Sequence, residues 1–180
     1  MNKKIQKLTY SALFLALAFV LPFFTGQIPQ IGRMLSPMHL PVMLCGFICG
    51  GPWGLAIGLI APILRSLIWG MPPMFPTAIA MAFELAAYGL FCGLFYKILQ
   101  NKIPRICAVY TSLILSMITG RLVWGAAQFV LLGINGGSFT FSAFLAGAVL
   151  NAVPAIVLQL ILVPAIVMLL EKSSLTPNKV

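Results

Sequence analysis

The stretch ICAVYTSLILSMITGRLVWGAAQFVLL, residues 106–132, contains one charged side chain, Arg121, in the middle of an otherwise apolar run. The run exceeds the ~20 residues that a helix needs to cross the hydrocarbon core of a bilayer. A charge at the centre of such a helix costs about 2.5–3.5 kcal/mol on insertion scales. Because such charges usually face a bundle interior or a wet cavity, Arg121 indicates a membrane protein with a polar interior site.

The composition of the whole chain agrees with a membrane protein. Of its 180 residues, 61% are hydrophobic and 7% are charged, whereas a soluble domain carries about 25% charged residues. The formal net charge of +9 is compatible with nucleic-acid binding, but the cations lie in short segments that flank apolar runs. That placement suits the anionic headgroups of lipids better.

Apolar stretches separated by Pro- and Gly-rich loops predict six membrane spans. The predicted helices cover residues 8–24, 39–49, 53–69, 77–99, 105–132 and 141–170, and the last one contains Pro154 and Pro164. The basic and apolar N-terminus imitates a secretory signal, but without a convincing cleavage site it is expected to remain as the first span. We therefore predict an all-α integral membrane protein whose single domain covers residues 1–180.

The loop charges predict how the chain is oriented. The side that holds both termini collects eight lysines and arginines, and the opposite side has only Arg33. Because cytoplasmic loops carry an excess of Lys and Arg, both termini are predicted to be cytoplasmic. The polar loop over residues 26–38 then faces outward, and it is expected to act as an extracellular lid because it is longer than a simple connection requires.

Polar side chains are expected to meet in the outer half of the membrane. At a rise of ~1.5 Å per residue, the position of each candidate along its predicted helix places it in the outer half of the membrane. Arg121, Trp124 and Gln128 also share one helical face. A pocket reached from outside is the simplest common explanation. The predicted substrate-binding residues are His39, Arg65, Glu84, Tyr88, Arg121, Trp124, Gln128 and Asn151.

The three buried charges also have structural interpretations. Arg65 and Glu84 are as well explained by an ion pair that holds their two helices together as by contact with a ligand, because intramembrane charges commonly pair. Arg121 then has no acid left, since Glu171 lies at the cytoplasmic end. Its alternatives are snorkelling and the capping of backbone carbonyls, but a ligand carboxylate suits its guanidinium fork better.

The remaining candidates have structural interpretations as well. Trp124, like Trp69, suits an interfacial belt of aromatic residues. His39 stands at a helix start, where a hydrogen bond to the backbone is as good an interpretation as a ligand contact. Asn151 is also suited to a hydrogen bond with a neighbouring helix.

The cysteines do not favour a metal site. Cys45 and Cys49 share a helical face, but His39 is the only histidine and the chain has no second cysteine pair. A zinc site needs more ligands than these. The cysteines are therefore expected to act as small buried apolar residues, and no metal or other cofactor is expected in this chain.

Small residues recur four positions apart. Ala12 and Ala16 form such a pair in the first predicted helix, and Gly54 with Gly58 and Gly89 with Gly93 repeat the spacing. Faces of this kind let helices approach closely. We expect the glycine pairs to serve internal packing rather than docking.

Taken together, the chain resembles a substrate-binding S component of an energy-coupling factor (ECF) vitamin transporter over nearly its whole length. The resemblance rests on the size, the six spans, the long outward loop and the segment Ala12-Leu13-Phe14-Leu15-Ala16. It rests also on RMLSPMHLPVMLCGFICG, residues 33–50, and GLIAPILRSLIWGMPPMFPTAIAMAFELAAYG, residues 58–89.

The resemblance implies a function, a set of partners and a location. In that family the alanine motif of the first helix docks on a membrane coupling subunit, which makes Ala12 and Ala16 the implied docking residues here. Two ATPase subunits drive that partner, and the S component binds a vitamin near the outer face and topples to release it. The implied location is the cell membrane of a bacterium. The chain itself lacks a GxxxxGK[ST] phosphate loop, so ATP hydrolysis is expected of the partners.

The charge balance suggests a substrate class. Two buried arginines against one buried glutamate leave one spare positive charge, which favours a small monoanion. Among ECF substrates pantothenate fits best, and its hydroxyls and amide would use Gln128, Asn151 and Tyr88. A pyridoxine-like vitamin, riboflavin or a cobalamin precursor are alternatives, because the aromatic side chains can stack a ring.

Two rival classes of function were compared with transport. An intramembrane enzyme needs paired carboxylates, a catalytic dyad or a metal motif, and the chain has no Asp and no HExxH sequence. An enzyme is therefore not expected. A structural or assembly subunit of a membrane complex explains the small-residue faces but gives no reason for Arg121.

Overall fold

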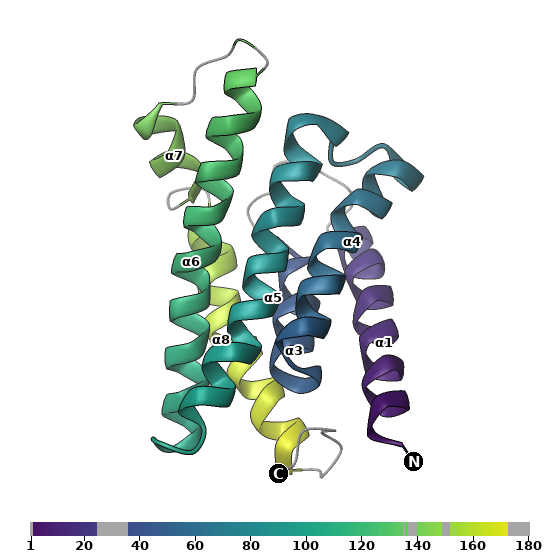
Figure 1. Cartoon of the computed structure of the whole chain (residues 1–180), viewed down its shortest axis with the longest axis vertical. Coiled ribbons are helices and arrows are strands. Elements are labelled where there is room, and N and C mark those ends of the chain that lie inside the picture. The colour runs from purple at the N-terminus through teal and green to yellow at the C-terminus, as the bar shows by residue number, and fades with distance from the viewer. Residues whose placement is uncertain (1, 25–35, 135, 137–139, 149–151, 173–180) are drawn as a thin grey trace.

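A computed structural model describes residues 2–24, 36–134, 136, 140–148 and 152–172. Within these ranges the chain contains no strand, and its helices pack into an elongated bundle (Figure 1). The elements are α1 (Lys3–Phe24), α3 (His39–Cys49), α4 (Gly51–Trp69), the π-helical segment η1 (Met74–Ala78), α5 (Ile79–Leu99), α6 (Arg105–Ile134), α7 (Phe141–Ala148) and α8 (Val153–Lys172).

Among the described residues, five helical segments are long and apolar enough to cross a membrane. They are α1, α4, η1 together with α5, α6 and α8. The helix α3 is also apolar but has only 11 residues, which is about 16 Å at the rise of an α-helix. That is roughly half of the ~30 Å hydrocarbon thickness. Five predicted spans are therefore confirmed by length and composition, and a sixth span stays a prediction.

The predicted helices differ from the structure at two places. The bounds predicted for the last span, residues 141–170, are wrong, because α7 and α8 are separate helices and the span is α8 alone, from Val153. Pro154 stands in the first turn of α8, where its missing N–H costs no helical hydrogen bond, so it starts this helix instead of kinking a longer one. In addition, α1 begins at Lys3, because residues 3–8 contain only good helix formers and β-branched Ile5.

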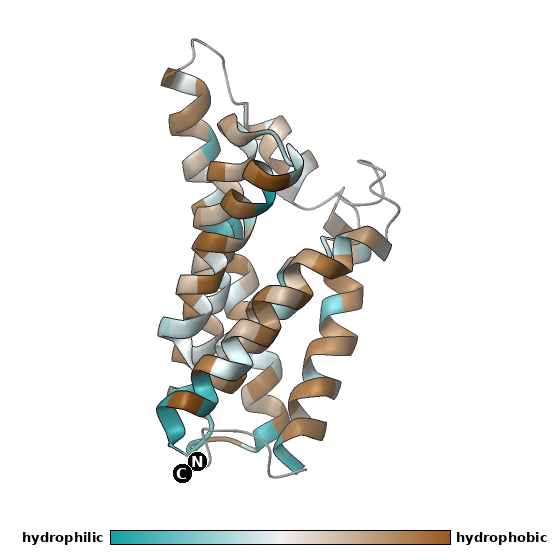
Figure 2. Cartoon of the chain, turned by 90° about the vertical axis from the view of Figure 1, so that its right-hand side faces the viewer, coloured by the Kyte–Doolittle hydropathy of each residue, from teal (hydrophilic) through white to brown (hydrophobic). Residues whose placement is uncertain are grey.

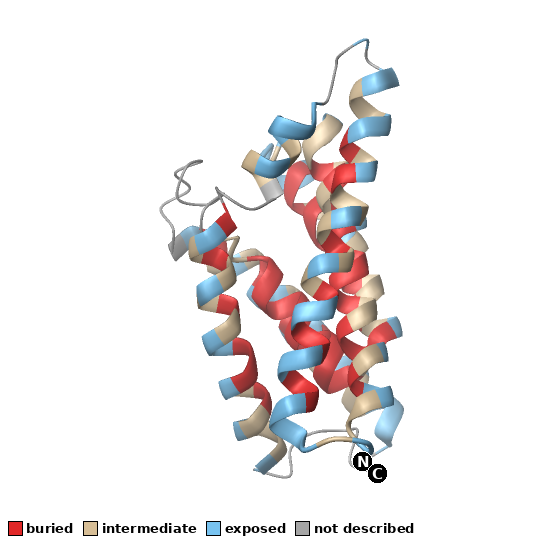
Figure 3. Ribbon diagram, turned by 90° about the vertical axis from the view of Figure 1, so that its left-hand side faces the viewer, coloured by how far each residue is buried: buried red, intermediate tan, exposed pale blue. Residues whose placement is uncertain are grey.

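The helix α3 lies inside the bundle, and all of its residues are buried. It contacts α1, α4, α5 and α8, and Figure 3 shows buried residues on the inner faces of the bundle and exposed residues on the outer faces. Cys45 of α3 packs as expected, with its Sγ 3.6 Å from the Ser11 Oγ of α1. Cys49 and Cys92 are buried too, but Cys107 is exposed, contrary to the expectation.

Glycines bring α3, α4 and α5 close enough for their backbones to touch. A Cβ atom at Gly89 would overlap the backbone of Gly54, and one at Gly58 would overlap the backbone of Leu85. A Cβ atom at Gly93 would likewise overlap the backbone of Gly46 and Gly51. The internal packing role that was predicted for the glycine pairs is confirmed. The three helices form a unit whose spacing positions the polar residues of the candidate site.

The two ends of the bundle differ in polarity. The helix α1 begins and α8 ends at the same end (Figure 1), and hydrophilic residues gather there (Figure 2). We call this the basic end because its described cations are Lys3, Lys4, Lys7, Lys97, Lys102, Arg105 and Lys172. Its cytoplasmic location stays a prediction. Of the predicted lid over residues 26–38, only Ser36, Pro37 and Met38 lie within the described residues.

The backbone contact between α4 and α5 can be tested with a single methyl group. We expect Gly89→Ala to lower the thermal unfolding temperature in detergent, because overpacking a tight contact costs about 1–3 kcal/mol. Gly133→Ala is the matched control, since nothing lies within 4 Å of a Cβ atom at that position. An unchanged unfolding temperature for Gly89→Ala would contradict the contact.

Candidate functional site

A buried ion pair joins α5 to α6. The Nη1 atom of Arg121 lies 2.8 Å from the Oε1 atom of Glu84, and the two side chains are 17% and 3% exposed. The approach is not aligned as a hydrogen bond, so the attraction is mainly electrostatic. The low dielectric of a buried site strengthens such an attraction. Arg121 therefore has an acidic partner within the protein, and the expectation that it lacks one is wrong.

His39 extends this pair to a third helix. Its Nε2 atom lies 3.6 Å from the Oε1 atom of Glu84, which is beyond hydrogen-bond distance but within electrostatic range. Tyr88 lies one turn beyond Glu84 on α5, and its ring centroid is 5.3 Å from that of His39. We call His39, Glu84, Tyr88 and Arg121 the buried cluster. Four of the predicted site residues are thus brought together, from α3, α5 and α6.

Gly120 makes room for the buried cluster. A Cβ atom at this position would overlap the ring of Tyr88, so the backbone of α6 lies directly against that ring. Arg121 follows Gly120 in the chain and reaches Glu84 on the same helix as Tyr88. Gly120 was not among the predicted site residues. Its one signal was a glycine that immediately precedes the intramembrane arginine.

The cluster keeps hydrogen-bonding capacity that described protein atoms do not use. Both ring nitrogens of His39 are buried without a hydrogen-bond partner among the described residues. The Oε1 atom of Gln128, two turns beyond Arg121 on α6, is buried without one as well. Because most buried polar atoms in proteins are hydrogen-bonded, unpartnered atoms on two helices beside an ion pair favour a site that takes a polar ligand.

Arg65 is placed differently from the expectation. It forms no ion pair with the described residues, so the alternative pairing with Glu84 is wrong. Its Nη1 atom donates to the Phe19 carbonyl oxygen at 3.4 Å. Its guanidinium carbon lies 5.7 Å from the ring centroid of Phe23 and 5.8 Å from that of Trp69. Arg65 therefore links α4 to the end of α1 through cation–π contacts.

Trp124, a further predicted site residue, does not join the buried cluster. Trp124 shares a helical face with Arg121, but its ring lies 6.2 Å from the Phe144 ring of α7, centroid to centroid. Its ring also lies against Gly147, where a Cβ atom would meet it at 2.6 Å. Trp124 thus belongs to the contact between α6 and α7. Asn151 lies outside the described residues, and its predicted role is untested.

The cluster lies in the half of the bundle away from the basic end. His39 begins α3 and Glu84 lies near the start of α5, and both helices run from that half toward the basic end (Figure 1). Arg121 lies beyond the middle of α6, which runs in the opposite direction. If the basic end is cytoplasmic, the cluster occupies the outer half of the membrane. The described residues contain no group of three or more His, Cys, Asp or Glu side chains that could hold a metal ion.

The chain was compared with known proteins. A model of the family described as "ECF transporter, substrate-specific component" matches residues 6–167. No curated protein and no solved structure matches the chain. The family match covers most of α1, most of α8 and everything between them, and therefore includes every residue of the buried cluster.

The ion pair leads to a prediction about stability. Arg121→Gln should lower the free energy of unfolding by about 3–5 kcal/mol, because it leaves the Glu84 carboxylate buried without a counter-charge. The double variant Glu84→Gln/Arg121→Gln removes both charges and should recover most of this loss. Thermal melting of the two variants in the same detergent measures the difference. Equal melting temperatures for the single and the double variant would contradict the pairing.

Proposed function

This chain belongs to the ECF transporter substrate-specific component family, and we propose that it captures a vitamin or related small nutrient from the outer side of the cell membrane. The buried cluster is the proposed point of contact. The observation that carries this proposal is an ion pair surrounded by unpartnered polar atoms, away from the basic end. A polar ligand would supply the hydrogen bonds that the ring nitrogens of His39 and the Oε1 atom of Gln128 do not make with described residues.

The charge of Arg65 indicates the class of substrate. Arg121 is balanced by Glu84, so the surplus positive charge belongs to Arg65. Among the described residues, Arg65 contacts aromatic rings and a carbonyl oxygen but no carboxylate. Arg65 lies near the end of α4 and Glu84 near the start of α5. The two helices are packed together. We therefore propose a small monoanion whose carboxylate meets Arg65 and whose uncharged polar groups meet the cluster.

Pantothenate is the first ligand to test, because its single carboxylate can meet Arg65 and its hydroxyl and amide groups can meet the buried cluster. A pyridoxine-like vitamin, riboflavin or a cobalamin precursor remains the alternative within transport. The mass of the small molecule that co-purifies with the chain tests the class, and stoichiometric binding of radiolabelled vitamins tests the ligand. A chain that retains no small molecule and binds no vitamin of the panel would instead be a structural or assembly subunit.

The role of Arg65 leads to a binding prediction. Arg65→Gln should weaken pantothenate binding by about tenfold or more, since hydrogen bonds to charged groups contribute about 1.5–3 kcal/mol. Binding of pantothenol, which has a hydroxyl in place of the carboxylate, should change little. Titration calorimetry in detergent measures both affinities. Equal losses for the two ligands would mean that Arg65 does not meet the carboxylate.

We propose further that α1 is the helix that docks on the membrane coupling subunit. Only 22% of its membrane window is buried, against 61% for the segment that contains α5. Ser11, Phe14 and Ala18 face the bundle, whereas Ala12 and Ala16 are exposed on the other side. Two exposed small residues one turn apart let a partner helix approach closely. Toppling against this partner, which two ATPase subunits would drive, completes the proposed transport mechanism.

The docking face leads to a prediction that separates binding from uptake. Ala12→Trp should leave vitamin binding to the purified chain unchanged, because the side chain points away from the bundle. It should strongly reduce vitamin uptake by cells that carry the whole complex, because an indole ring blocks close helix approach. Val157→Trp on the exposed side of α8 is the control. Normal uptake with Ala12→Trp would mean that another face docks.

A further inference from the structure

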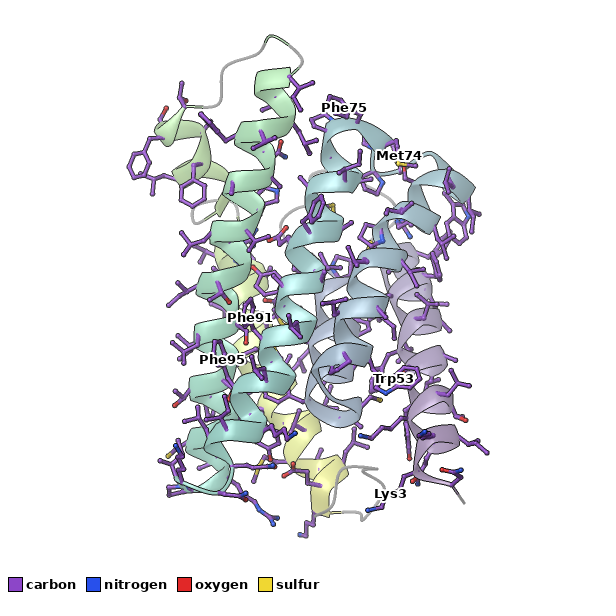
Figure 4. All side chains as sticks on the ribbon, in the orientation of Figure 1. Lys3, Trp53, Met74, Phe75, Phe91 and Phe95 are labelled. Carbon is purple, nitrogen blue, oxygen red and sulfur yellow. The ribbon has the colours of Figure 1, made fainter. Side chains whose placement is uncertain are left out.

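The basic end contains a cavity of about 570 Å³ that the candidate site does not use. Residues of α1, α3, α4, α5, α6 and α8 form its walls. Figure 4 shows Trp53 between α4 and α1 near this end, with Lys3 farther toward the tip. Part of the wall is apolar, and its members are Phe47, Ile48, Trp53, Leu90, Leu94 and Val167. The cavity can therefore hold an apolar group.

Cations from three helices surround this cavity. They are Lys7 of α1, Lys97 of α5 and Arg105 at the start of α6. None of them forms an ion pair with another described residue. The only acid in the cavity wall is Glu171, so three cations against one carboxylate leave a surplus of two positive charges. An anion bound here would neutralise that surplus.

Glu171 adds a requirement for a hydrogen-bond donor. Its Oε1 atom accepts a hydrogen bond from the Tyr96 hydroxyl at 2.5 Å. Its Oε2 atom is buried and has no hydrogen-bond partner among the described residues. A buried carboxylate oxygen without a donor is costly. A ligand that suits the whole cavity thus combines an anionic group with a hydroxyl and an apolar part.

We propose that this cavity binds the headgroup of an anionic phospholipid that carries hydroxyl groups, of the phosphatidylglycerol type. The phosphate lies among Lys7, Lys97 and Arg105, and a glycerol hydroxyl donates to the Oε2 atom of Glu171. The acyl chains leave along the apolar wall beside Trp53. Basic pockets between membrane helices on the cytoplasmic side are known receptors for anionic headgroups. The site is independent of the proposed vitamin site at the other end of the bundle.

Native mass spectrometry of the full chain, supplied with phosphatidylglycerol or phosphatidylcholine in mixed micelles, tests this proposal. The wild-type chain should retain one phosphatidylglycerol and no defined phosphatidylcholine. Lys97→Gln/Arg105→Gln removes two exposed cations, so the fold should persist. It should weaken phosphatidylglycerol binding roughly 30-fold, which corresponds to about 1 kcal/mol for each cation. Vitamin binding should not change.

The matched control is Lys3→Gln/Lys4→Gln. It removes the same charge from the same end of the bundle, outside the cavity wall, and should bind phosphatidylglycerol like the wild-type chain. Equal losses in the two double variants would overturn the proposal, because the basic end would then attract anions without a site. Displacement of the lipid by equimolar glycerol phosphate would assign the cavity to a free phosphate ester. Intact lipid binding in Lys97→Gln/Arg105→Gln, with failed assembly on the coupling subunit, would assign the cations to a protein partner.

Discussion

The ion pair between Glu84 and Arg121 is the constraint on which the interior of this protein depends. Each charge alone would be expensive in a bilayer, and together they offset much of that cost because they meet at 2.8 Å. The pair is useful only while α5 and α6 keep their spacing. The packing of Tyr88 against Gly120 fixes that spacing one turn from the pair. Electrostatics and close packing therefore reinforce each other at the same level of the bundle.

The two intramembrane arginines have different surroundings, and this difference shapes the proposed ligand. Arg121 is held by a carboxylate, so its charge is largely compensated within the protein. Arg65 is held by aromatic rings and a carbonyl oxygen, which attract its charge without neutralising it. A ligand anion interacts more favourably with a cation such as Arg65, because no protein carboxylate has to be displaced first.

Polar groups are unevenly divided between the two ends of the bundle. Away from the basic end, a few buried polar atoms without partners lie beside one compensated ion pair. At the basic end, cations surround a cavity with an apolar wall. The first arrangement suits a small solute that is enclosed by protein. The second suits an amphiphile whose tail stays in the bilayer. A single bundle would thus bind the proposed nutrient and the proposed lipid at separate sites, without competition between them.

The class of the protein and most of its helices follow from the order of its amino acids alone. Long apolar runs can be satisfied in a bilayer only as helices, and Gly and Pro mark where those runs end, so no tertiary information was needed. Polar side chains within these apolar runs are expected to face the inside of the bundle and not the lipid. This expectation applied to His39, Glu84, Tyr88 and Arg121. The family was also within reach of the sequence, and the match over residues 6–167 confirms it.

Which of these residues are partners depends on how the helices pack, and the sequence did not reveal it. Arg65 and Arg121 are both predicted at a membrane depth close to that of Glu84. Depth along a helix does not say which neighbouring helix a side chain faces. Arg121 pairs with Glu84 because α5 and α6 pack with these two side chains facing each other. Gly120 allows this close packing, since α6 lies against the ring of Tyr88 there. The division between α7 and α8 has a local signal, Pro154 in the first turn of α8, but a proline inside a long apolar run is equally compatible with one kinked membrane helix. The cavity at the basic end has no such signal, because it depends on how helices far apart in the chain pack together.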